Sequence, residues 1–410
     1  MLSLCNFDQY PSPLKFRIYI ALVFFCFIQT TVVFANNTRT IQFEFYGDSF
    51  AFTFDDSSFV DFTEPLSQNS LESFYNSIIQ KNYQPVINAL KDYKEKYKPD
   101  DWMFYQLIRK TVQQISPKLK NYPRYTLYKW YFLSRSGYDA TIRIAADKIL
   151  FYVQSDEIIY NIPYYMKNNK QYVCLNYHDY GQIDFEINKF AEVALHVPGA
   201  DKTFSYTITQ MPAFKPGDYI EKDISFDYNQ TTYHFKVKLN PEVQTIFANY
   251  PLLDYNYYFN IPLSKETYSS LIPSLKKTVH GLNEKNGVDY LMHFTRYAFL
   301  FKKDTDAFGK EKRMSPEETL LYEESDCEDR AALFFYLVKE IYNLPMIVLE
   351  YPQHVTVAVE FNKPIGNTIV YKGRKYSVCE PTPQRMDLPI GKQLPALKKE
   401  AFEVVYEYTP

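Results

Sequence analysis

The stretch 322–338, YEESDCEDRAALFFYLV, sets one cysteine among five carboxylates and continues with a run of eight apolar residues. Ser325 and Glu328 have the spacing of a capping box, which predicts that a helix begins just after Ser325. Cys327 then lies in the first turn, where unpaired backbone N–H groups and the helix dipole favour an anion. The stretch therefore predicts a buried helix with a thiol at its positive end.

Helical periodicity predicts where these side chains point. Cys327 shares one face of the helix with the apolar positions Ala331, Phe334 and Val338, and Glu328 and Asp329 are expected to face away from the core. The carboxylates disfavour a thiolate, whereas contact with a protonated histidine can bring a thiol pKa down to roughly 3.5–7.5. A free cysteine is also among the most buried residue types, so a purely structural role is the alternative.

Two later segments could supply partners for the thiol. In YPQHVTVAVEF (351–361), alternation puts His354 on one face with Thr356 and Ala358, and these small neighbours predict that a helix approaches that face. In TIVYKGRKYSVCEPT (368–382), Glu380 closes the second strand of a hairpin. A helix-start thiol, a strand histidine and a strand-end carboxylate can act as nucleophile, base and orienting group. A packed histidine and a strand-ending carboxylate are the structural alternatives.

The segments SDCEDRAALFFYLVKEIYNLP, HVTVAV and GRKYSVCEPT resemble, in this order, the transglutaminase-like superfamily in its bacterial exported branch. The resemblance covers about residues 268–384 and implies a papain-like α+β core. It implies that Cys327 is the nucleophile, that His354 is the general base and that Glu380 stands where the family has Asp. The implied activity is cleavage of amide or peptide bonds in a protein or peptide substrate, with hydrolysis favoured over cross-linking. Because Glu replaces Asp, a catalytically inactive scaffold for protein or envelope binding is the alternative.

At 410 residues the chain is longer than one ordinary core, so several domains are expected. Strand-like and helix-like segments alternate in blocks along the sequence. The expected units are a signal peptide at 1–35, an N-terminal α+β domain at 36–182, a β-rich, β-sandwich-like middle domain at 183–262, and the transglutaminase-like domain at 263–410.

The N-terminal domain has the pattern of a degenerate repeat of the C-terminal core. LYKWYFLSRSGYDATIRIAADKILFYV (127–153) aligns without a gap with LFFYLVKEIYNLPMIVLEYPQHVTVAV (333–359), and NKQYVCLNY aligns with GRKYSVCEPT. In this alignment the places of Cys327, His354 and Glu380 are taken by Asn121, Lys148 and Asn176. Two unrelated α+β segments with the same apolar periodicity are the alternative.

The N-terminus predicts a secretory signal peptide, with a retained membrane anchor as the alternative that Gln29, Thr30 and Thr31 disfavour. Basic residues precede the apolar run IYIALVFFCFIQTTVVFA, which ends at Ala35 with small-residue cleavage spacing. No later stretch is apolar enough to span a membrane, so an exported, periplasmic or cell-surface protein is expected. Cleavage leaves Cys174, Cys327 and Cys379, an odd number, so at least one thiol stays unpaired within the chain.

The composition argues against several other functions. The net charge is −3, without the basic excess that a nucleic-acid-binding surface needs. The sequence has neither a phosphate-binding loop nor a dinucleotide fingerprint, so no cofactor is expected. One Cys, one His and one Glu also lack the paired ligand spacing of a zinc site, so no metal is expected.

Overall fold

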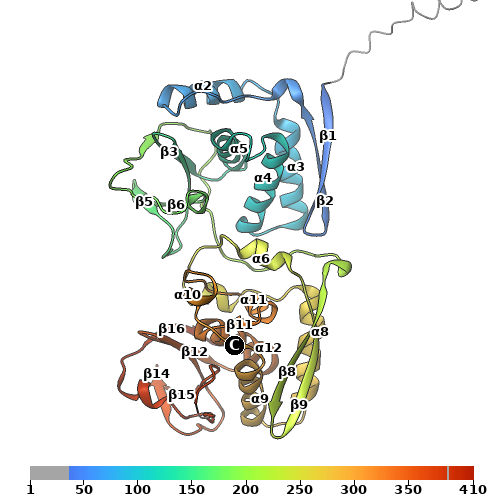
Figure 1. The fold of residues 1–410 in the computed structure, drawn as a ribbon, viewed down its shortest axis with the longest axis vertical. Helices are drawn as coiled ribbons and strands as arrows, with labels where there is room; N and C mark the ends of the chain where they lie inside the picture. The colour runs from blue at the N-terminus through green and yellow to red at the C-terminus, as the bar shows by residue number, and fades with distance from the viewer. Residues whose placement is uncertain (1–36, 386) are drawn as a thin grey trace, which may run out of the picture.

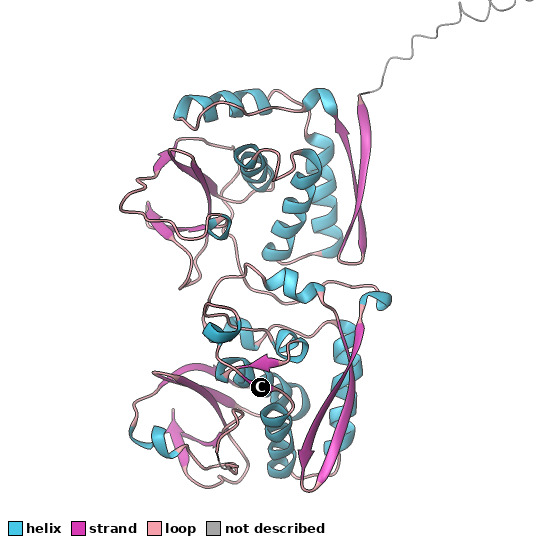
Figure 2. Cartoon of the chain, viewed as in Figure 1, coloured by secondary structure: helices cyan, strands magenta, loops and turns pink. Residues whose placement is uncertain are grey.

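The computed structural model describes residues 37–385 and 387–410, which form two halves that lie one above the other in Figure 1. The predicted signal peptide lies outside the described residues. Helices and strands occupy separate layers, which agrees with the predicted α+β class. In each half a two-stranded hairpin and a larger sheet flank a group of helices, as the cyan and magenta segments of Figure 2 show.

The N-terminal half begins with a hairpin, continues with four helices and ends with five strands. Its elements are β1 (Thr38–Phe45), β2 (Asp48–Asp55), η1 (Asp56–Ser58), α2 (Gln68–Ile78), α3 (Gln84–Tyr97), α4 (Asp101–Ile115), α5 (Tyr122–Arg135), β3 (Ala140–Ala145), β4 (Lys148–Gln154), β5 (Tyr164–Lys167), β6 (Lys170–Cys174), η2 (Tyr177–Asp179) and β7 (Ala191–Val193).

The C-terminal half follows the same order with extra helices inserted. Its elements are η3 (Pro216–Asp218), β8 (Ile220–Tyr228), β9 (Thr231–Leu239), α6 (Glu242–Phe247), α7 (Tyr255–Phe259), α8 (Lys265–Val279), α9 (Glu284–Tyr297), β10 (Leu300–Phe301), α10 (Asp304–Ala307), α11 (Pro316–Leu321), β11 (Glu324–Ser325), α12 (Cys327–Tyr342), β12 (Met346–Tyr351), β13 (His354–Val359), β14 (Thr368–Tyr371), β15 (Arg374–Cys379), η4 (Pro395–Lys399) and β16 (Glu403–Tyr408).

The two five-stranded sheets have the same strand order. The N-terminal sheet runs β5-β6-β4-β3-β7 and the C-terminal sheet runs β14-β15-β13-β12-β16. The two strands that follow the long helix pair antiparallel: β3 with β4 after α5, and β12 with β13 after α12. A later hairpin, β5–β6 or β14–β15, extends each pair on one side. The two halves therefore share one topology, from the opening hairpin to the last strand.

Two-residue turns fix the register of the hairpins. At the β8–β9 turn, Asn229 and Gln230 both have positive φ, 50° and 63°, as a type I′ turn requires. The predicted turn at Lys372-Gly373 is confirmed, because Tyr371 pairs with Arg374 across it. Along β8 and β9 buried and exposed residues alternate, so that one face of the hairpin packs on helices and the other faces solvent.

The prediction of a β-sandwich-like middle domain at 183–262 is wrong. The strands described in this range are β7, which joins the N-terminal sheet, and the β8–β9 hairpin, which packs against α8 and α9. Their alternating pattern shows that each strand has one buried face, but not which partner covers it. Here the partner is a helix layer instead of a second sheet.

The segment between β9 and α8 packs against the N-terminal half. Trp102 of α4 donates from Nε1 to the carbonyl of Ile246 in α6 at 3.0 Å, and Tyr250 donates from its hydroxyl to the carbonyl of Tyr206. Both aromatic side chains are buried in a core that extends through both halves. The halves therefore share hydrophobic packing as well as a covalent connection.

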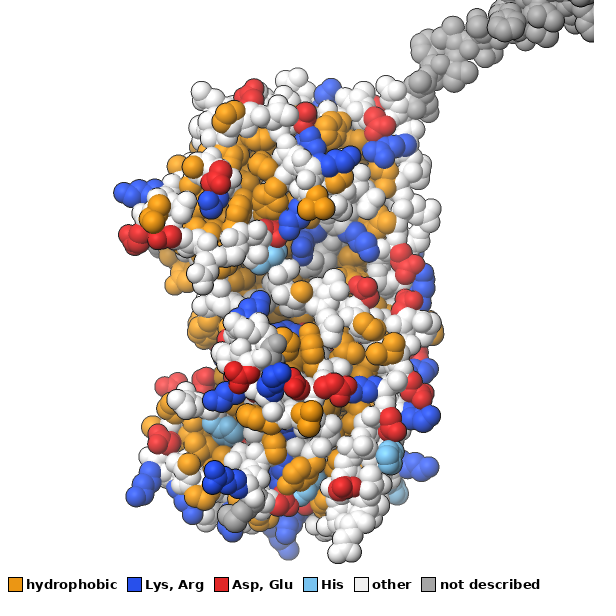
Figure 3. Space-filling model, in the orientation of Figure 1, with side chains coloured by type: hydrophobic (Ala, Val, Ile, Leu, Met, Phe, Trp, Pro, Cys, Tyr) orange, Lys and Arg blue, Asp and Glu red, His pale blue; other side chains and the backbone are white. Residues whose placement is uncertain are grey.

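Among the described residues, none of the helices has the length and apolar character needed to cross a bilayer. On the face shown in Figure 3, acidic and basic side chains are interspersed, without a continuous area of either sign. This mixed surface corresponds to the small net charge of −3.

Candidate active site

Helix α12 begins at Cys327, and its cap is Asp326, so the predicted cap at Ser325 is wrong. The Asp326 N–H donates to Asp329 Oδ2 at 3.4 Å. Ser325 instead ends the short strand β11, which pairs with β10, and this pairing holds it in an extended conformation. The shift leaves Cys327 in the first turn, as expected, where it is half-buried.

Helix α12 packs on the valine face of β13, so the predicted approach to the His354 face is wrong. Val355, Val357 and Val359 lie in the same core as the apolar side of α12, whereas Ala358 lies in a separate cluster on the other face of the sheet. The three valines offer more apolar surface to the helix than the face that carries Thr356 and Ala358. Cys327 consequently meets β13 at its first residues.

The structure pairs His354 with Glu380. His354 is the first residue of β13, Glu380 follows β15, and the two strands are neighbours in the sheet. His354 Nε2 lies 2.8 Å from Glu380 Oε2, and the Glu380 side chain is only 2% exposed. The longer side chain of Glu therefore reaches the imidazole from the place that the resemblance gives to Asp.

The surroundings fix the Glu380 carboxylate. The backbone N–H of Thr382 donates to Glu380 Oε1 at 3.0 Å, so each carboxylate oxygen has a partner. The fully buried Arg296 of α9 donates from Nε to the backbone carbonyl of Glu380 at 3.1 Å. With the carboxylate so held, His354 Nε2 is engaged, and Nδ1 is the ring nitrogen left for a reacting thiol.

The Cys327 thiol points to a carboxylate instead of to the histidine. Sγ donates to Glu328 Oε2 at 2.7 Å, and among the described residues no hydrogen bond joins Cys327 to His354. Burial, and next the charge of Glu328, raise the pKa of Cys327 far above its ordinary value. The backbone N–H of Val355 acts in the opposite direction but is the smaller influence. The resting thiol is therefore protonated and is not part of a thiolate–imidazolium pair with His354.

The carboxylates near Cys327 do not all face away from the core as predicted. Asp329 is fully buried and accepts a hydrogen bond from the backbone N–H of Met314 at 2.8 Å. Glu328 is half-buried, and although burial opposes ionisation, hydrogen bonds from Cys327 and Glu311 lower its pKa. The helical wheel could not reveal this because the segment 301–315, which covers this side of α12, has no regular periodicity.

Two groups of side chains here have an arrangement that could hold a metal ion. Asp326, Cys327 and Glu328 bring ligand atoms within 4.8 Å of one another, and so do Asp304, Glu311 and Asp326. The second set has only oxygen ligands, which suit a hard divalent cation such as Ca²⁺ or Mg²⁺. Sequence reasoning missed Asp304, which begins the short helix α10, and Glu311 of the loop that follows, because both come close to Asp326 only in the fold.

Cys327 and His354 line one cavity of about 600 Å³. Its walls come from the start of α12, the β12–β13 turn, the segment after β15, and α10 with the loop that follows it. The cavity therefore brings together two of the three side chains that the sequence singled out, while Glu380 lies behind His354. A reacting carbonyl could enter it.

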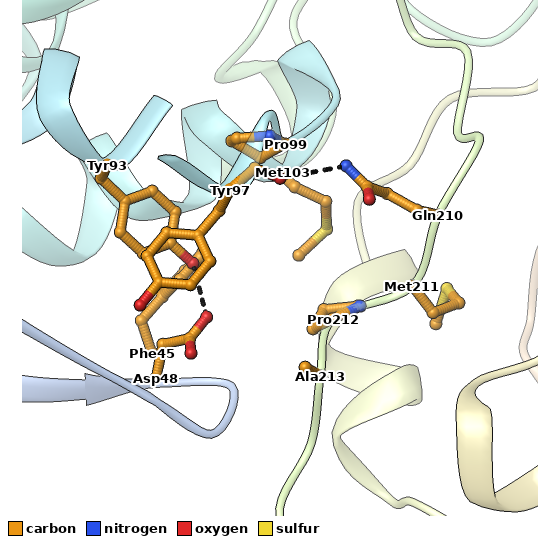
Figure 4. A pocket seen from close by; sticks show the side chains of 10 residues that line it. All are labelled: Phe45, Asp48, Tyr93, Tyr97, Pro99, Met103, Gln210, Met211, Pro212 and Ala213. Carbon is orange, nitrogen blue, oxygen red and sulfur yellow. Dashed lines mark hydrogen bonds between the residues drawn. The ribbon is translucent and has the colours of Figure 1, made fainter. Parts of the chain in front are cut away.

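A separate cavity of about 160 Å³ lies in the N-terminal half, between α3, α4 and the segment 210–213. Figure 4 shows Tyr93 and Tyr97 lying next to each other, with the Tyr93 hydroxyl donating to Asp48 Oδ2 at 3.2 Å. Gln210 reaches across and donates to the carbonyl of Lys98 at 2.6 Å. Its lining contains neither thiol nor imidazole, so this cavity offers no second nucleophilic site.

The N-terminal half carries different chemistry at the corresponding places. Lys148 begins β4 as His354 begins β13, and Asn176 follows β6 closely as Glu380 follows β15. Asn121 caps α5, one position earlier than Cys327 in α12, and accepts a hydrogen bond from the Arg124 N–H. Asn176 is fully buried and bonds to the Phe151 N–H and the Tyr122 hydroxyl. The two asparagines therefore stabilise the start of α5 and its contact with the sheet, while Lys148 pairs with its neighbour Asp147.

No protein-family model matches the chain, and no curated protein matches it either. The assignment of a function therefore depends on the geometry of the residues around Cys327.

Proposed function

We propose that the C-terminal half is an exported transglutaminase-like cysteine enzyme with a papain-like site that hydrolyses amide or peptide bonds. The observation that carries this proposal is His354, which lines the same cavity as the helix-start Cys327 and is held from behind by the buried Glu380 carboxylate at 2.8 Å. Nucleophile, base and orienting group come from a helix, a strand and a strand end. Their order and secondary structure are those implied by the resemblance.

In the proposed mechanism the thiol first leaves Glu328 and turns to His354. Sγ attacks the carbonyl carbon while its proton passes to Nδ1 of His354, and the Cys327 backbone N–H is a candidate donor to the developing oxyanion. The imidazolium then gives this proton to the departing nitrogen, and a thioester forms. Water, deprotonated by His354, attacks the thioester, which releases the carboxylic acid and restores the thiol.

The protonated resting thiol supports general-base catalysis over a preformed ion pair. Because burial and Glu328 favour the thiol, proton transfer to His354 must accompany the attack. Glu380 stabilises the imidazolium that this transfer creates and engages Nε2, which leaves Nδ1 available to the thiol.

The test is acyl-enzyme trapping with the mature full-length protein and a pool of fluorogenic peptides. Hydroxylamine should capture the acyl group as a hydroxamate, and an acid quench should show a thioester on Cys327 by intact mass. Cys327→Ala should abolish both products, and His354→Ala should reduce turnover by at least about 100-fold. Full turnover by Cys327→Ala would rule out this mechanism.

One observation favours a second candidate, a catalytically inactive scaffold for protein or envelope binding. The thiol is bound to Glu328, with a raised pKa, instead of to His354. This candidate predicts that Cys327→Ser leaves partner binding unchanged and that iodoacetamide modifies Cys327 no faster than it modifies glutathione. Hydroxamate formation that depends on both Cys327 and His354 in the trapping experiment would contradict the scaffold.

A further inference from the structure

The cavity that contains Cys327 continues past His354 into a second cavity of about 510 Å³. Both cavities are lined by Tyr351, Pro352, Gln353, His354 and Gln384. Together they form one cleft that passes the candidate nucleophile and base. A cleft open on both sides of the reacting groups suits an extended chain, with residues bound on either side of the bond that is cut.

The two ends of the cleft differ in chemistry. Beyond His354, the segment around η4 contributes Leu394, Ala396 and Leu397, with Glu400 at its edge. On the Cys327 side, separate elements contribute a group of carboxylates, which we call the acidic wall: Asp304 of α10, Glu311 of the following loop, Asp326 and Glu328 at the start of α12, and Glu350 of β12.

The cations nearby are too few to balance this wall. Lys303 lines the cavity, and Arg313 stands behind it, with its guanidinium 3.9 Å from the centroid of the Tyr255 ring and a hydrogen bond to the Leu253 carbonyl. Lys312 donates its backbone N–H to Asp304 Oδ2 at 2.7 Å, but its ammonium group pairs with Glu318. Five carboxylates and one lysine thus line this cavity among the described residues.

Asp326 supplies a separate indication of a missing partner. Its side chain is 6% exposed, and Oδ1 has no hydrogen-bond partner among the described residues. One of its carboxylate oxygens lies within 4.8 Å of those of Asp304 and Glu311, so the unpaired group faces the acidic wall. A buried polar atom without a partner is costly, and a cationic donor entering the cavity would provide one.

We propose, on the basis of the function proposed above, that the acidic wall binds a lysine or arginine side chain of a peptide substrate. The apolar end beyond His354 then takes an apolar residue on the other side of the cut. A cation bound between Asp304, Glu311 and Glu328 competes with the Cys327 thiol for Glu328. Substrate binding therefore frees Sγ to turn toward His354.

The experiment measures how Cys327 discriminates between charged thiol reagents. Methanethiosulfonates that carry a trimethylammonium, a neutral methyl or a sulfonate group are reacted with the full-length protein and, for reference, with glutathione. Labelling is read by mass spectrometry at Cys327, since Cys174 and Cys379 are buried. The variants are Glu311→Gln and Glu328→Gln. Glu323→Gln is the matched control, because Glu323 is exposed, pairs with Lys222 and does not line the cavity.

We expect the cationic reagent to react about ten- to a thousandfold faster than the anionic one after normalisation to glutathione. Glu311→Gln and Glu328→Gln should each reduce this ratio, and Glu323→Gln should not. Equal normalised rates, or a Cys327 that no reagent reaches, would overturn the inference. So would Ca²⁺ or Mg²⁺ at micromolar concentration, if it removed the preference and raised the melting temperature, because the wall would then be a metal site.

Cleavage of peptides that differ at one position tests the cation site and the proposed hydrolase separately. In a quenched-fluorescence series that differs at one position, Lys or Arg should raise kcat/KM over norleucine by at least about tenfold. If the reagents discriminate and no peptide is cleaved, the cation site stands and the proposed hydrolase fails. If peptides are cleaved without a preference for Lys or Arg, the hydrolase stands and this inference fails.

Discussion

At the scale of single residues, Glu328 has the largest influence on the candidate nucleophile after burial itself. It is next to Cys327 in sequence, and its Oε2 accepts a hydrogen bond from Cys327 Sγ at 2.7 Å. Its charge and this hydrogen bond both stabilise the thiol relative to the thiolate, against the helix dipole. The local surroundings therefore hold Cys327 in a resting form.

Replacing Glu328 by Gln should make Cys327 more acidic. The substitution removes the negative charge and keeps the size of the side chain, so the pKa of Cys327 should fall while burial continues to hold it above the ordinary value. At pH 8 we expect iodoacetamide to label Cys327 roughly tenfold faster, the effect of one pKa unit. The measurement is alkylation against pH, with Glu323→Gln as control. An unchanged rate would contradict the role given to Glu328.

Replacing Glu380 by Ala should destabilise the fold. The change leaves His354 Nε2 and the Thr382 N–H without their partner in a buried place, which costs about 1–3 kcal/mol. Urea unfolding measures this loss. Glu360→Ala, which breaks the more exposed pair with Arg374, is the control and should cost about 0–1 kcal/mol. Similar losses in both variants would show that the Glu380 contacts are not specially stabilising.

At the scale of elements, hydrogen bonds from Arg330 connect the start of α12 to the end of α9. Its side chain is fully buried and donates to the carbonyls of Thr295, Arg296 and Phe299 at 3.1, 2.8 and 2.9 Å. These three carbonyls lie where α9 ends, and such groups lack partners within the helix. One guanidinium thus satisfies several buried acceptors and sets the position of Cys327.

Arg330→Met should reduce stability by about 3–5 kcal/mol, since three buried carbonyls and the nearby Asp329 lose their cation. Lys339→Met on the same helix is the control and should stay within about 1 kcal/mol, because Lys339 has one partner and is half-buried. Chemical denaturation compares the two. Equal effects would contradict the fastening role of Arg330.

The acidic wall should make stability depend on pH. Burial, a hydrogen bond to Glu328 and neighbouring charges raise the pKa of Glu311 to about 7, above its unfolded value. Between the two pKa values the folded protein binds more protons than the unfolded chain, so this residue's contribution to stability falls as pH rises. In Glu311→Gln the decrease in melting temperature from pH 5 to pH 8 should therefore be smaller than in the wild type. A parallel pH dependence in the two proteins would contradict this assignment.

At the scale of the whole molecule, each half begins with a hairpin that covers its helices. In the C-terminal half, the rings of Phe226 and Phe235 lie 5.6 and 5.7 Å from that of Phe294 in α9. The predicted start of the C-terminal unit at 263 leaves this hairpin out. The structural unit starts near residue 219, because the apolar faces of α8 and α9 need the hairpin to cover them.

A chain of residues 264–410 should therefore fail to fold, whereas residues 219–410 should unfold cooperatively. The shorter chain exposes aromatic side chains of α9 and also loses α7, whose Phe259 ring lies 5.2 Å from Phe335 of α12. Circular dichroism melting and NMR peak dispersion distinguish the two chains, with residues 37–410 as reference. Cooperative melting of 264–410 would contradict the placement of the boundary.

The sequence by itself predicted the features that depend on local periodicity and turn chemistry. The apolar run after Cys327 predicted α12, and alternation with the Lys372-Gly373 turn predicted β13 to β15. The gapless alignment of 127–153 with 333–359 predicted the shared order of helix and strands that the two sheets display. These features depend on residues close together in the chain, so the sequence contains the information directly.

Only the tertiary structure decided which groups meet. Contacts between distant segments place α12 on the valine face of β13 and bring Asp304 and Glu311 close to Asp326. The same packing leaves the Cys327 thiol bonded to Glu328. Periodicity identifies a buried face but not its partner, and a carboxylate in a loop gives no pattern at all. The sequence thus determined the elements and the candidate nucleophile, while packing decided its protonation and the chemistry of the surrounding cleft.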